Sequence, residues 1–398
     1  MLSVLLIEAV PGGLRAEPPW VNKTDLFEAR TGGYRTYRIP GVVVTAKGVI
    51  LAYCEARKFT GNDWDTIDVV LRRSTDGGKT WEPMRKISDI PGPKARSEVA
   101  LAHHLGKPDD VTYNNPVAIA DSKPGVVHFL FCLDYGRCFY MRSDDDGVTF
   151  GAPVEITGAF EKFRPQYDWH VLATGPGHGI QLKNGRLLVP VWLSTGKFGH
   201  HPSVAGTIFS DDNGKTWQAG DIAVPSTDEW VSPNETAVVQ LADGRVMLNS
   251  RSESTANRRL ITIGANGSTD WAKPRFDSAL LEPICMASIV RLTAKPESDK
   301  NRLVFSNPDN LERADGKEKP GKSRDRKNLS IKLSYDEGET WPVNKALEPG
   351  ASEYSDLAAM PDGTLLCFYS RKGMVTMAHF NLEWLTGGAD SISGQPSK

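Results

Sequence analysis

The stretch Ser74-Thr75-Asp76-Gly77-Gly78-Lys79-Thr80-Trp81 recurs along the chain in the form S-x-D-x-G-x-T followed by Trp or Phe. Three further copies occupy residues 143–150, 210–217 and 334–341, so that successive copies start 69, 67 and 124 residues apart. The last spacing is close to twice the others, and Ser268-Thr269-Asp270-Trp271 stands near the missing place as a remnant. Repetition at a regular period is the signature of a repeat architecture.

Each copy follows an apolar run typical of a strand, such as Val69-Val70-Leu71 before the first copy. Asp and Gly supply the chemistry of a hairpin turn, because Asp bonds nearby backbone N–H groups and Gly tolerates positive φ. We therefore expect each copy to form a turn between two strands, with the closing aromatic side chain packed beside it.

A second repeat combines a turn glycine with an apolar strand. Its five clear copies begin at Gly48, Gly125, Gly185, Gly244 and Gly363, and a degenerate copy at residues 302–305 makes a sixth. Units of this length, each with several short strands, fit four-stranded propeller blades. No long stretch shows the 3.6-residue period of an amphipathic helix. The sequence predicts an all-β fold, a six-bladed β-propeller of four-stranded antiparallel sheets, as one domain over residues 25–390.

Composition narrows the functional classes. The 398 residues carry a formal net charge of −2, which gives no reason to expect binding to nucleic acid or to an anionic membrane. The five cysteines form no CxxC pair and no Cys/His spacing typical of zinc. We interpret them as buried apolar thiols and expect no metal, while a disulfide between Cys132 and Cys138 stays open.

The N-terminus resembles the end of an export signal. Met1–Val10 is apolar but too short to span a bilayer, and Leu14-Arg15-Ala16 resembles a cleavage site, although a basic region is missing. We interpret residues 1–16 as a signal-peptide remnant, which predicts a secreted or periplasmic protein. No other segment is a candidate membrane span.

The repeated turn resembles the Asp-box, or BNR repeat, whose aspartate has a structural role. Tyr37-Arg38-Ile39-Pro40, directly before an apolar strand, resembles the F/Y-R-I-P signature of exo-α-sialidases. The resemblance runs over residues 36–384 through the following segments: Glu55-Ala56-Arg57 with Asp63, residues 175–179, Asn234-Glu235, Asn249-Ser250-Arg251, residues 326–329 and residues 353–357. On these motifs the chain is identified as a member of the exo-α-sialidase (neuraminidase) family.

The resemblance implies a carboxylate-binding triad of Arg38, Arg251 and Arg326, with Arg57 as an accessory binding residue. Sialic acid carries a carboxylate on its anomeric carbon, and the planar guanidinium fork matches carboxylate geometry. Arg324 is an alternative to Arg326 by a shift of register. Strand alternation favours Arg326, because it places this residue opposite the apolar face of the following strand.

The resemblance also implies the chemical groups. Asp63 matches the general acid/base, with Asp65 and Asp68 as nearby alternatives, and Tyr354 with Glu235 resembles the nucleophile pair. A carboxylate nucleophile would be repelled by the substrate's own carboxylate. A phenol stays neutral until Glu235 withdraws its proton.

One position departs from the family pattern. The strand equivalent to residues 365–370 usually ends in a Glu that braces the first arginine, and here Ser370 stands at that position. The sequence therefore leaves open which acid orients Arg38, with Glu55 as one candidate.

The predicted function is that of a retaining exo-α-sialidase, a glycoside hydrolase acting on sialylated glycans of glycoproteins, glycolipids and oligosaccharides without a cofactor. One alternative is a non-catalytic sialoglycan-binding propeller, which would keep the arginines but tolerate loss of Asp63, Glu235 or Tyr354. Another is an enzyme that hydrolyses a related nonulosonic acid or transfers the sugar. The arginines read only the carboxylate, so they do not separate these substrates. Linkage preference and oligomeric state do not follow from the sequence.

Overall fold

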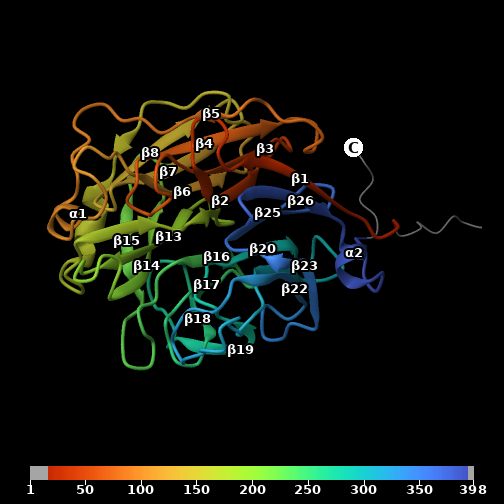
Figure 1. The fold of residues 1–398 in the computed structure, drawn as a ribbon. Helices are drawn as coiled ribbons and strands as arrows, with labels where there is room; N and C mark the ends of the chain where they lie inside the picture. The colour runs from red at the N-terminus through yellow and green to blue at the C-terminus, as the bar shows by residue number, and fades with distance from the viewer. Residues whose placement is uncertain (1–16, 393–398) are drawn as a thin grey trace, which may run out of the picture.

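Six β-sheets stand as blades around a common centre in the computed structural model, which describes residues 17–392 (Figure 1). Each blade is built on four antiparallel strands, and two blades gain a further strand of two residues. This arrangement confirms the predicted all-β, six-bladed propeller. Helical structure in the described residues is limited to α1 (Glu98–Ala102), α2 (Leu382–Thr386) and a 3₁₀ segment at Thr157–Phe163.

The blades follow the chain in order. Blade 1 contains β2 (Thr36–Val44), β3 (Ile50–Arg57), β4 (Ile67–Ser74) and β5 (Arg85–Lys86). Blade 2 contains β6 (Tyr113–Ala120), β7 (Val127–Leu133), β8 (Arg137–Ser143) and β9 (Val154–Glu155), with β11 (Gly177–His178) added in parallel to β6. Blade 3 contains β10 (Val171–Thr174), β13 (Leu187–Ser194), β14 (Ser203–Ser210) and β15 (Gln218–Val224), with β12 (Ile180–Gln181) paired to β13.

Blades 4 to 6 complete the ring. Blade 4 contains β16 (Thr236–Gln240), β17 (Val246–Ser250), β18 (Arg258–Gly264) and β19 (Arg275–Leu281). Blade 5 contains β20 (Ser288–Thr293), β21 (Arg302–Pro308), β22 (Lys327–Ser334) and β23 (Val343–Ala351). Blade 6 contains β24 (Ser355–Ala359), β25 (Leu365–Arg371), β26 (Met374–Phe380) and, from the other end of the chain, β1 (Val21–Glu28).

The first strand of the chain closes the ring. β1 pairs antiparallel with β26, from Val21 opposite Phe380 to Glu28 opposite Met374. In Figure 1 the red β1 lies beside the blue β26. Blade 6 is therefore assembled from both ends of the chain, and its outer strand is β1. Pairing of this kind leaves no open edge on β26 that could template aggregation.

Both sequence repeats occupy equivalent places in the blades. The turn-glycine units form the second strands, namely β3, β7, β13, β17, β21 and β25. The four clear Asp-box copies lie between the third and fourth strands of blades 1, 2, 3 and 5, and the remnant at residues 268–271 lies between β18 and β19. The spacing therefore identified the blade count correctly.

Each Asp-box closes on itself through side-chain hydrogen bonds. In the last copy, Asp336 accepts the Thr340 backbone N–H at 2.8 Å and the Thr340 hydroxyl at 2.6 Å. The Ser334 hydroxyl donates to the same carboxylate and accepts the Gly338 N–H at 2.9 Å. These contacts lie on the outer part of the blade and stabilise a turn.

We expect Asp336→Ala to lower the free energy of unfolding without changing activity at 25 °C. The expected loss is about 1 kcal/mol, because a hydrogen bond in a partly solvated turn contributes about that much net. Urea unfolding checks it. Glu339→Ala is the matched control, since Glu339 lies in the same turn but forms an exposed ion pair with Arg275. Equal stability of the two variants would contradict a structural role for the box.

Apolar side chains fill the spaces between neighbouring blades. Between blades 1 and 2, Tyr53 packs edge-on against Phe129 with ring centroids 5.0 Å apart. The Tyr53 hydroxyl donates to the Gly177 carbonyl at 2.7 Å and accepts the Ala118 N–H at 2.9 Å. This buried tyrosine therefore ties the inner strands of blade 2 to blade 1 and fixes the angle between blades.

The remaining expectations concern thiols, metals and membranes. All five cysteines are buried and free. Cys132 in β7 lies opposite Cys138 in β8, but the two form no disulfide bond. Over residues 17–392 no cluster of three or more His, Cys, Asp or Glu side chains could hold a metal ion, and no helix is long and apolar enough to cross a membrane. The interpretation of residues 1–16 as a signal-peptide remnant falls outside the described part of the chain.

Candidate active site

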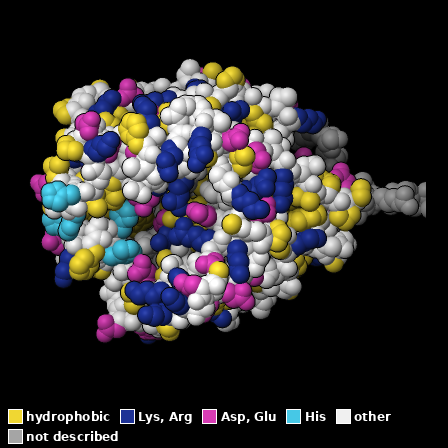
Figure 2. Space-filling view, in the orientation of Figure 1, with side chains coloured by type: hydrophobic (Ala, Val, Ile, Leu, Met, Phe, Trp, Pro, Cys, Tyr) yellow, Lys and Arg dark blue, Asp and Glu magenta, His cyan; other side chains and the backbone are white. Residues whose placement is uncertain are grey.

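The predicted site residues lie at the ends of strands on one side of the ring. Glu235 directly precedes β16 and Arg251 directly follows β17, where the two antiparallel strands meet the same edge. Arg326 precedes β22 and Tyr354 precedes β24 in the same way. On the face shown in Figure 2, basic and acidic side chains gather around a hollow in the middle. Together with Arg38 from blade 1, the predicted residues of this charged site thus come from four blades.

A bulge in β2 aims Arg38 at this site. The β2–β3 register shifts between Arg38 and Gly41, and Ile39 adopts a φ of 58°, a left-handed value that is strained for a β-branched residue. A side chain at Gly41 would collide with the Tyr53 ring, which lies 2.1 Å from the place of an added Cβ. The Arg-Ile-Pro-Gly motif therefore forms a β-bulge that directs the Arg38 side chain toward the site.

Tyr354, Glu235 and Arg251 form one hydrogen-bonded group. The Tyr354 hydroxyl donates to Glu235 Oε1, and Arg251 Nη1 donates to Glu235 Oε2 and, at 2.9 Å, to the Tyr354 oxygen. Burial and the Glu235 carboxylate raise the pKa of Tyr354 far above its ordinary value, although Arg251 and Arg326 act in the opposite direction. The phenol is therefore neutral at pH 7, with a base in place to take its proton.

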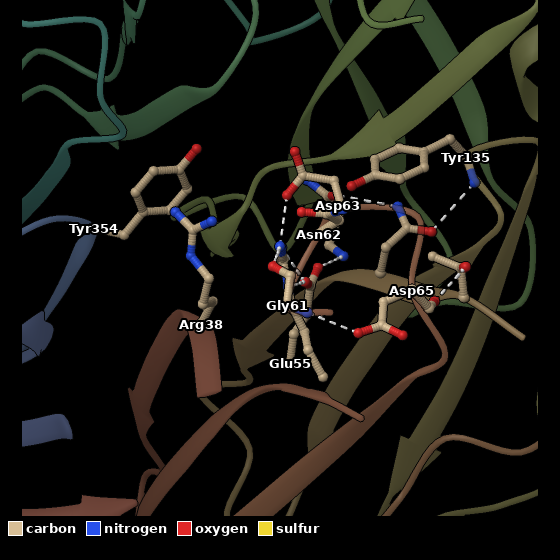
Figure 3. A network of polar contacts seen from close by, with 12 residues as sticks. Arg38, Glu55, Gly61, Asn62, Asp63, Asp65, Tyr135 and Tyr354 are labelled. Carbon is tan, nitrogen blue, oxygen red and sulfur yellow. Dashed lines mark hydrogen bonds and ion pairs between the residues drawn. The ribbon is translucent and has the colours of Figure 1, made fainter. Parts of the chain in front are cut away.

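Arg38 and Arg326 lie against the Tyr354 ring. Their guanidinium carbons are 5.9 and 5.3 Å from the ring centroid, and Figure 3 shows Arg38 beside Tyr354. Arg326 Nη2 also donates to the Ile284 carbonyl at 2.8 Å. The alternative Arg324 points into its own loop, where it donates to backbone carbonyls that include Leu311. The geometry thus places Arg326, and not Arg324, in the site.

Arg57 lies between two carboxylates. Arg57 Nη2 contacts Glu55 at 2.7 Å and Arg57 Nη1 contacts Asp63 at 2.7 Å, with Arg57 and Glu55 fully buried. Burial would raise the pKa of Asp63, but the charge and hydrogen bond of Arg57, together with the charge of Arg38, outweigh it and lower the pKa to about 2. Asp63 is therefore ionised at neutral pH. Its carboxyl is the solvent-facing member of the group, at 47% exposure.

The acid expected to orient Arg38 is not the one that sequence reasoning considered. Glu55 is occupied by Arg57 and by the Asn115 backbone N–H at 2.9 Å. Glu353 contacts Arg38 Nη2 at 2.8 Å instead. The suggestion that Glu55 braces Arg38 was therefore wrong, because the short Glu55–Arg57 contact within β3 already uses that carboxylate.

Asp65 fixes the loop that carries Asp63. Asp65 Oδ2 accepts the backbone N–H groups of Phe59, Thr60 and Gly61 at 2.7–2.9 Å. Figure 3 shows Asp65 beside Gly61. Asp65 is buried, and its pKa is lowered because these hydrogen bonds outweigh the effect of burial. Asp65 therefore holds the loop rather than facing the site.

We expect Asp65→Ala to lower kcat by about 10- to 100-fold while the protein stays folded, because a displacement of about 1 Å in a reacting group has effects of that size. Steady-state kinetics and thermal unfolding check it. Asp68→Ala is the matched control, since Asp68 pairs with Lys86 and Tyr34 away from this loop. Equal activity of both variants would show that the hydrogen bonds to Asp65 are not needed to position Asp63.

An aromatic cluster borders Asp63 and was missed by sequence reasoning. His200, from the connection between β13 and β14, stacks on Trp64 with ring centroids 5.4 Å apart and lies 4.6 Å from the Tyr135 ring. Burial lowers the pKa of His200 to about 4 despite the nearby Asp63, so the ring is neutral. No local pattern marks His200, because it belongs to a loop without repeat character.

Comparison with known proteins identifies the family of the chain. Residues 51–367 match the model of the BNR repeat-like domain, which is most of the chain. The chain belongs to the BNR-repeat family of exo-α-sialidases. It is 30% identical to a sialidase of Micromonospora viridifaciens over 95% of this chain and 56% of that protein. It is 31% identical to a sialidase of Bacteroides fragilis over 77% of this chain and 54% of that protein.

Solved structures give the same fold. The Hadza microbial sialidase Hz136 superposes with a TM-score of 0.71 at 28% identity, over 89% of this chain and 67% of that one. The intramolecular trans-sialidase of Ruminococcus gnavus superposes with a TM-score of 0.69 at 16% identity, which shows the fold alone. This exo-α-sialidase family member spans about half the length of the curated relatives named above.

Proposed function

We propose that the chain is a retaining exo-α-sialidase that uses Tyr354 as nucleophile. The observation that carries the proposal is the neutral Tyr354 phenol bonded to Glu235 within a group of three arginines. A cationic receptor of this kind suits a sugar that bears a carboxylate at its anomeric carbon. A buried phenol with its own base suits attack at that carbon.

In the first step the carboxylate of the terminal sugar binds Arg38, Arg251 and Arg326. Tyr354 Oη forms a bond to the anomeric carbon, and its proton passes to Glu235. The bond from that carbon to the leaving oxygen breaks, and this oxygen takes a proton that Asp63 has first gained from solvent. The products are a glycosyl-tyrosine and the shortened glycan.

In the second step Asp63, now ionised, removes a proton from water that attacks the same carbon. The bond to Tyr354 breaks, and the phenolate recovers its proton from Glu235. Two displacements at one carbon restore the original configuration, so the α-anomer is released first. Arg57 would hold Asp63 through its 2.7 Å contact and favour the ionised form needed in this step.

The proposal is tested with 3′-sialyllactose and the purified chain, followed by proton NMR. We expect release of the α-anomer of the N-acetyl sugar before its mutarotation. Immediate release of the β-anomer would contradict retention. A folded protein that releases no sugar would contradict hydrolysis of the common sialosides, and assays with other nonulosonic acids and a glycan-binding measurement would then separate the remaining functions.

A further inference from the structure

Glu353 contacts two of the three arginines of the candidate carboxylate receptor. Its Oε2 atom lies 2.8 Å from Arg38 Nη2 and 3.7 Å from Arg326 Nη1. Both arginines lie against the ring of Tyr354, the next residue along the chain. One carboxylate oxygen therefore bridges two guanidinium groups that flank the same aromatic ring.

Arg38 depends on this carboxylate. Over residues 17–392 no other acid lies within 4.0 Å of its guanidinium group. Arg251 differs, because Glu235 pairs with it, and Arg326 has the Ile284 carbonyl as a further acceptor. An arginine side chain has many rotamers, and a fixed acceptor selects among them. Two guanidinium groups over one ring also repel each other, and a negative charge between them offsets this repulsion.

The backbone of Glu353 is fixed together with that of Tyr354. The Glu353 N–H donates to the Ser370 carbonyl at 2.9 Å, and the Ser370 N–H donates to the Tyr354 carbonyl at 3.0 Å. The Ser370 hydroxyl is buried and has no hydrogen-bond partner within the described residues. The end of β25 therefore holds the Glu353 backbone in place but supplies no charge of its own to the arginines.

Donors remain free for a ligand. Glu353 contacts one nitrogen of each arginine, and the side chains of Arg38 and Arg326 are 29% and 22% exposed. A guanidinium group has five N–H donors in a planar fork. An incoming carboxylate can therefore bind the unused donors while Glu353 keeps its contacts.

We propose that Glu353 is the positioning residue that holds Arg38 and Arg326 ready for the substrate carboxylate. The inference rests on the proposed function and deepens it, because it names the acid that prepares the anion receptor. Arginines that bind the carboxylate in ground state and transition state alike affect KM more than kcat. Loss of Glu353 is therefore expected to weaken binding and to leave the chemical step nearly intact.

The test compares Glu353→Ala and Glu353→Gln with the parent chain. Kinetics use 3′-sialyllactose, and titration calorimetry uses the sialidase inhibitor DANA. For Glu353→Ala we expect KM and the inhibitor Kd to rise about tenfold, with kcat within about threefold of the parent. For Glu353→Gln, which keeps an acceptor without the charge, we expect a smaller rise in both constants.

Glu312→Ala is the matched control, since Glu312 pairs with Lys327 beside Arg326 but is 77% exposed outside the receptor. Unchanged KM and Kd in an active Glu353→Ala variant would overturn the positioning role. Tighter binding would also overturn it, because Glu353 would then compete with the ligand carboxylate. If Glu353→Ala does not fold, the same criteria apply to Glu353→Gln. A parent chain that neither hydrolyses the sialoside nor binds the inhibitor contradicts the proposed function itself.

Discussion

Replacement of Tyr354 by phenylalanine is expected to lower kcat by at least about 10³-fold, as removal of the nucleophile does in other covalent enzymes. The ring, its packing and the two arginines over it would remain, whereas the oxygen that forms the bond would be lost. The variant would also lose covalent labelling by 2,3-difluorosialic acid. Intact-protein mass spectrometry followed by peptide mapping measures this, and in the parent chain we expect the adduct on Tyr354.

Tyr369→Phe is the matched control for that experiment. Tyr369 is also a buried tyrosine that donates to a glutamate, Glu348, at 3.0 Å. Burial and Glu348 raise the pKa of Tyr369 as burial and Glu235 raise that of Tyr354, so the two phenols share their chemistry. Tyr369 lies outside the arginine group, and we expect its variant to keep activity and labelling. An adduct on another residue would reject Tyr354 as the nucleophile.

Asp63→Ala is expected to lower kcat/KM for 3′-sialyllactose by about 10²- to 10⁴-fold, which is the usual contribution of a general acid/base group. The loss should be much smaller for a 4-methylumbelliferyl sialoside, because that leaving group departs without a proton. Parallel assays of both substrates measure the difference. An equal loss on both would indicate that Asp63 positions the substrate and does not donate a proton.

The pH dependence gives a second test of Asp63. Its pKa of about 2 means that the protonated form becomes scarcer as pH rises through the neutral range. For the parent chain, kcat/KM for 3′-sialyllactose should therefore rise as pH falls from 7 toward 5, and Asp63→Ala should lose this dependence. A parent profile that rises toward alkaline pH would contradict the assigned role.

The site also explains how so many charges coexist in one hollow. Arg57 pairs with Glu55 and Asp63, Arg251 pairs with Glu235, and Arg38 pairs with Glu353. A buried charge without a partner is strongly destabilising. The acids therefore serve the fold as well as the chemistry.

Local turn and strand chemistry made the fold predictable from sequence. Eight residues suffice for an Asp-box, because Asp336 bonds to Thr340 four positions away. Turn glycines mark the second strand of five of the six blades, so their period counts the blades. The Arg-Ile-Pro motif likewise predicted Arg38, because the bulge that aims it lies within the motif.

The closure of the ring and the partners of the site residues were decided by tertiary structure. β1 completes a blade whose other strands lie at the far end of the chain, and nothing in its own residues names β26 as its partner. Asp65 accepts backbone N–H groups of its own loop, whereas Asp63 accepts a hydrogen bond from Arg57. The conformation of the loop decides which carboxylate takes which partner.

The repeating blade, the number of blades and the residue types of the candidate site could be predicted from local sequence patterns. Which acid serves Arg38 was settled only in three dimensions, because Glu353 lies 315 residues away from it. The contact forms only when all six blades close into a ring, which brings Arg38 in β2 close to Glu353, just before β24. No local pattern encodes such a meeting, since it depends on the packing of all the blades between them.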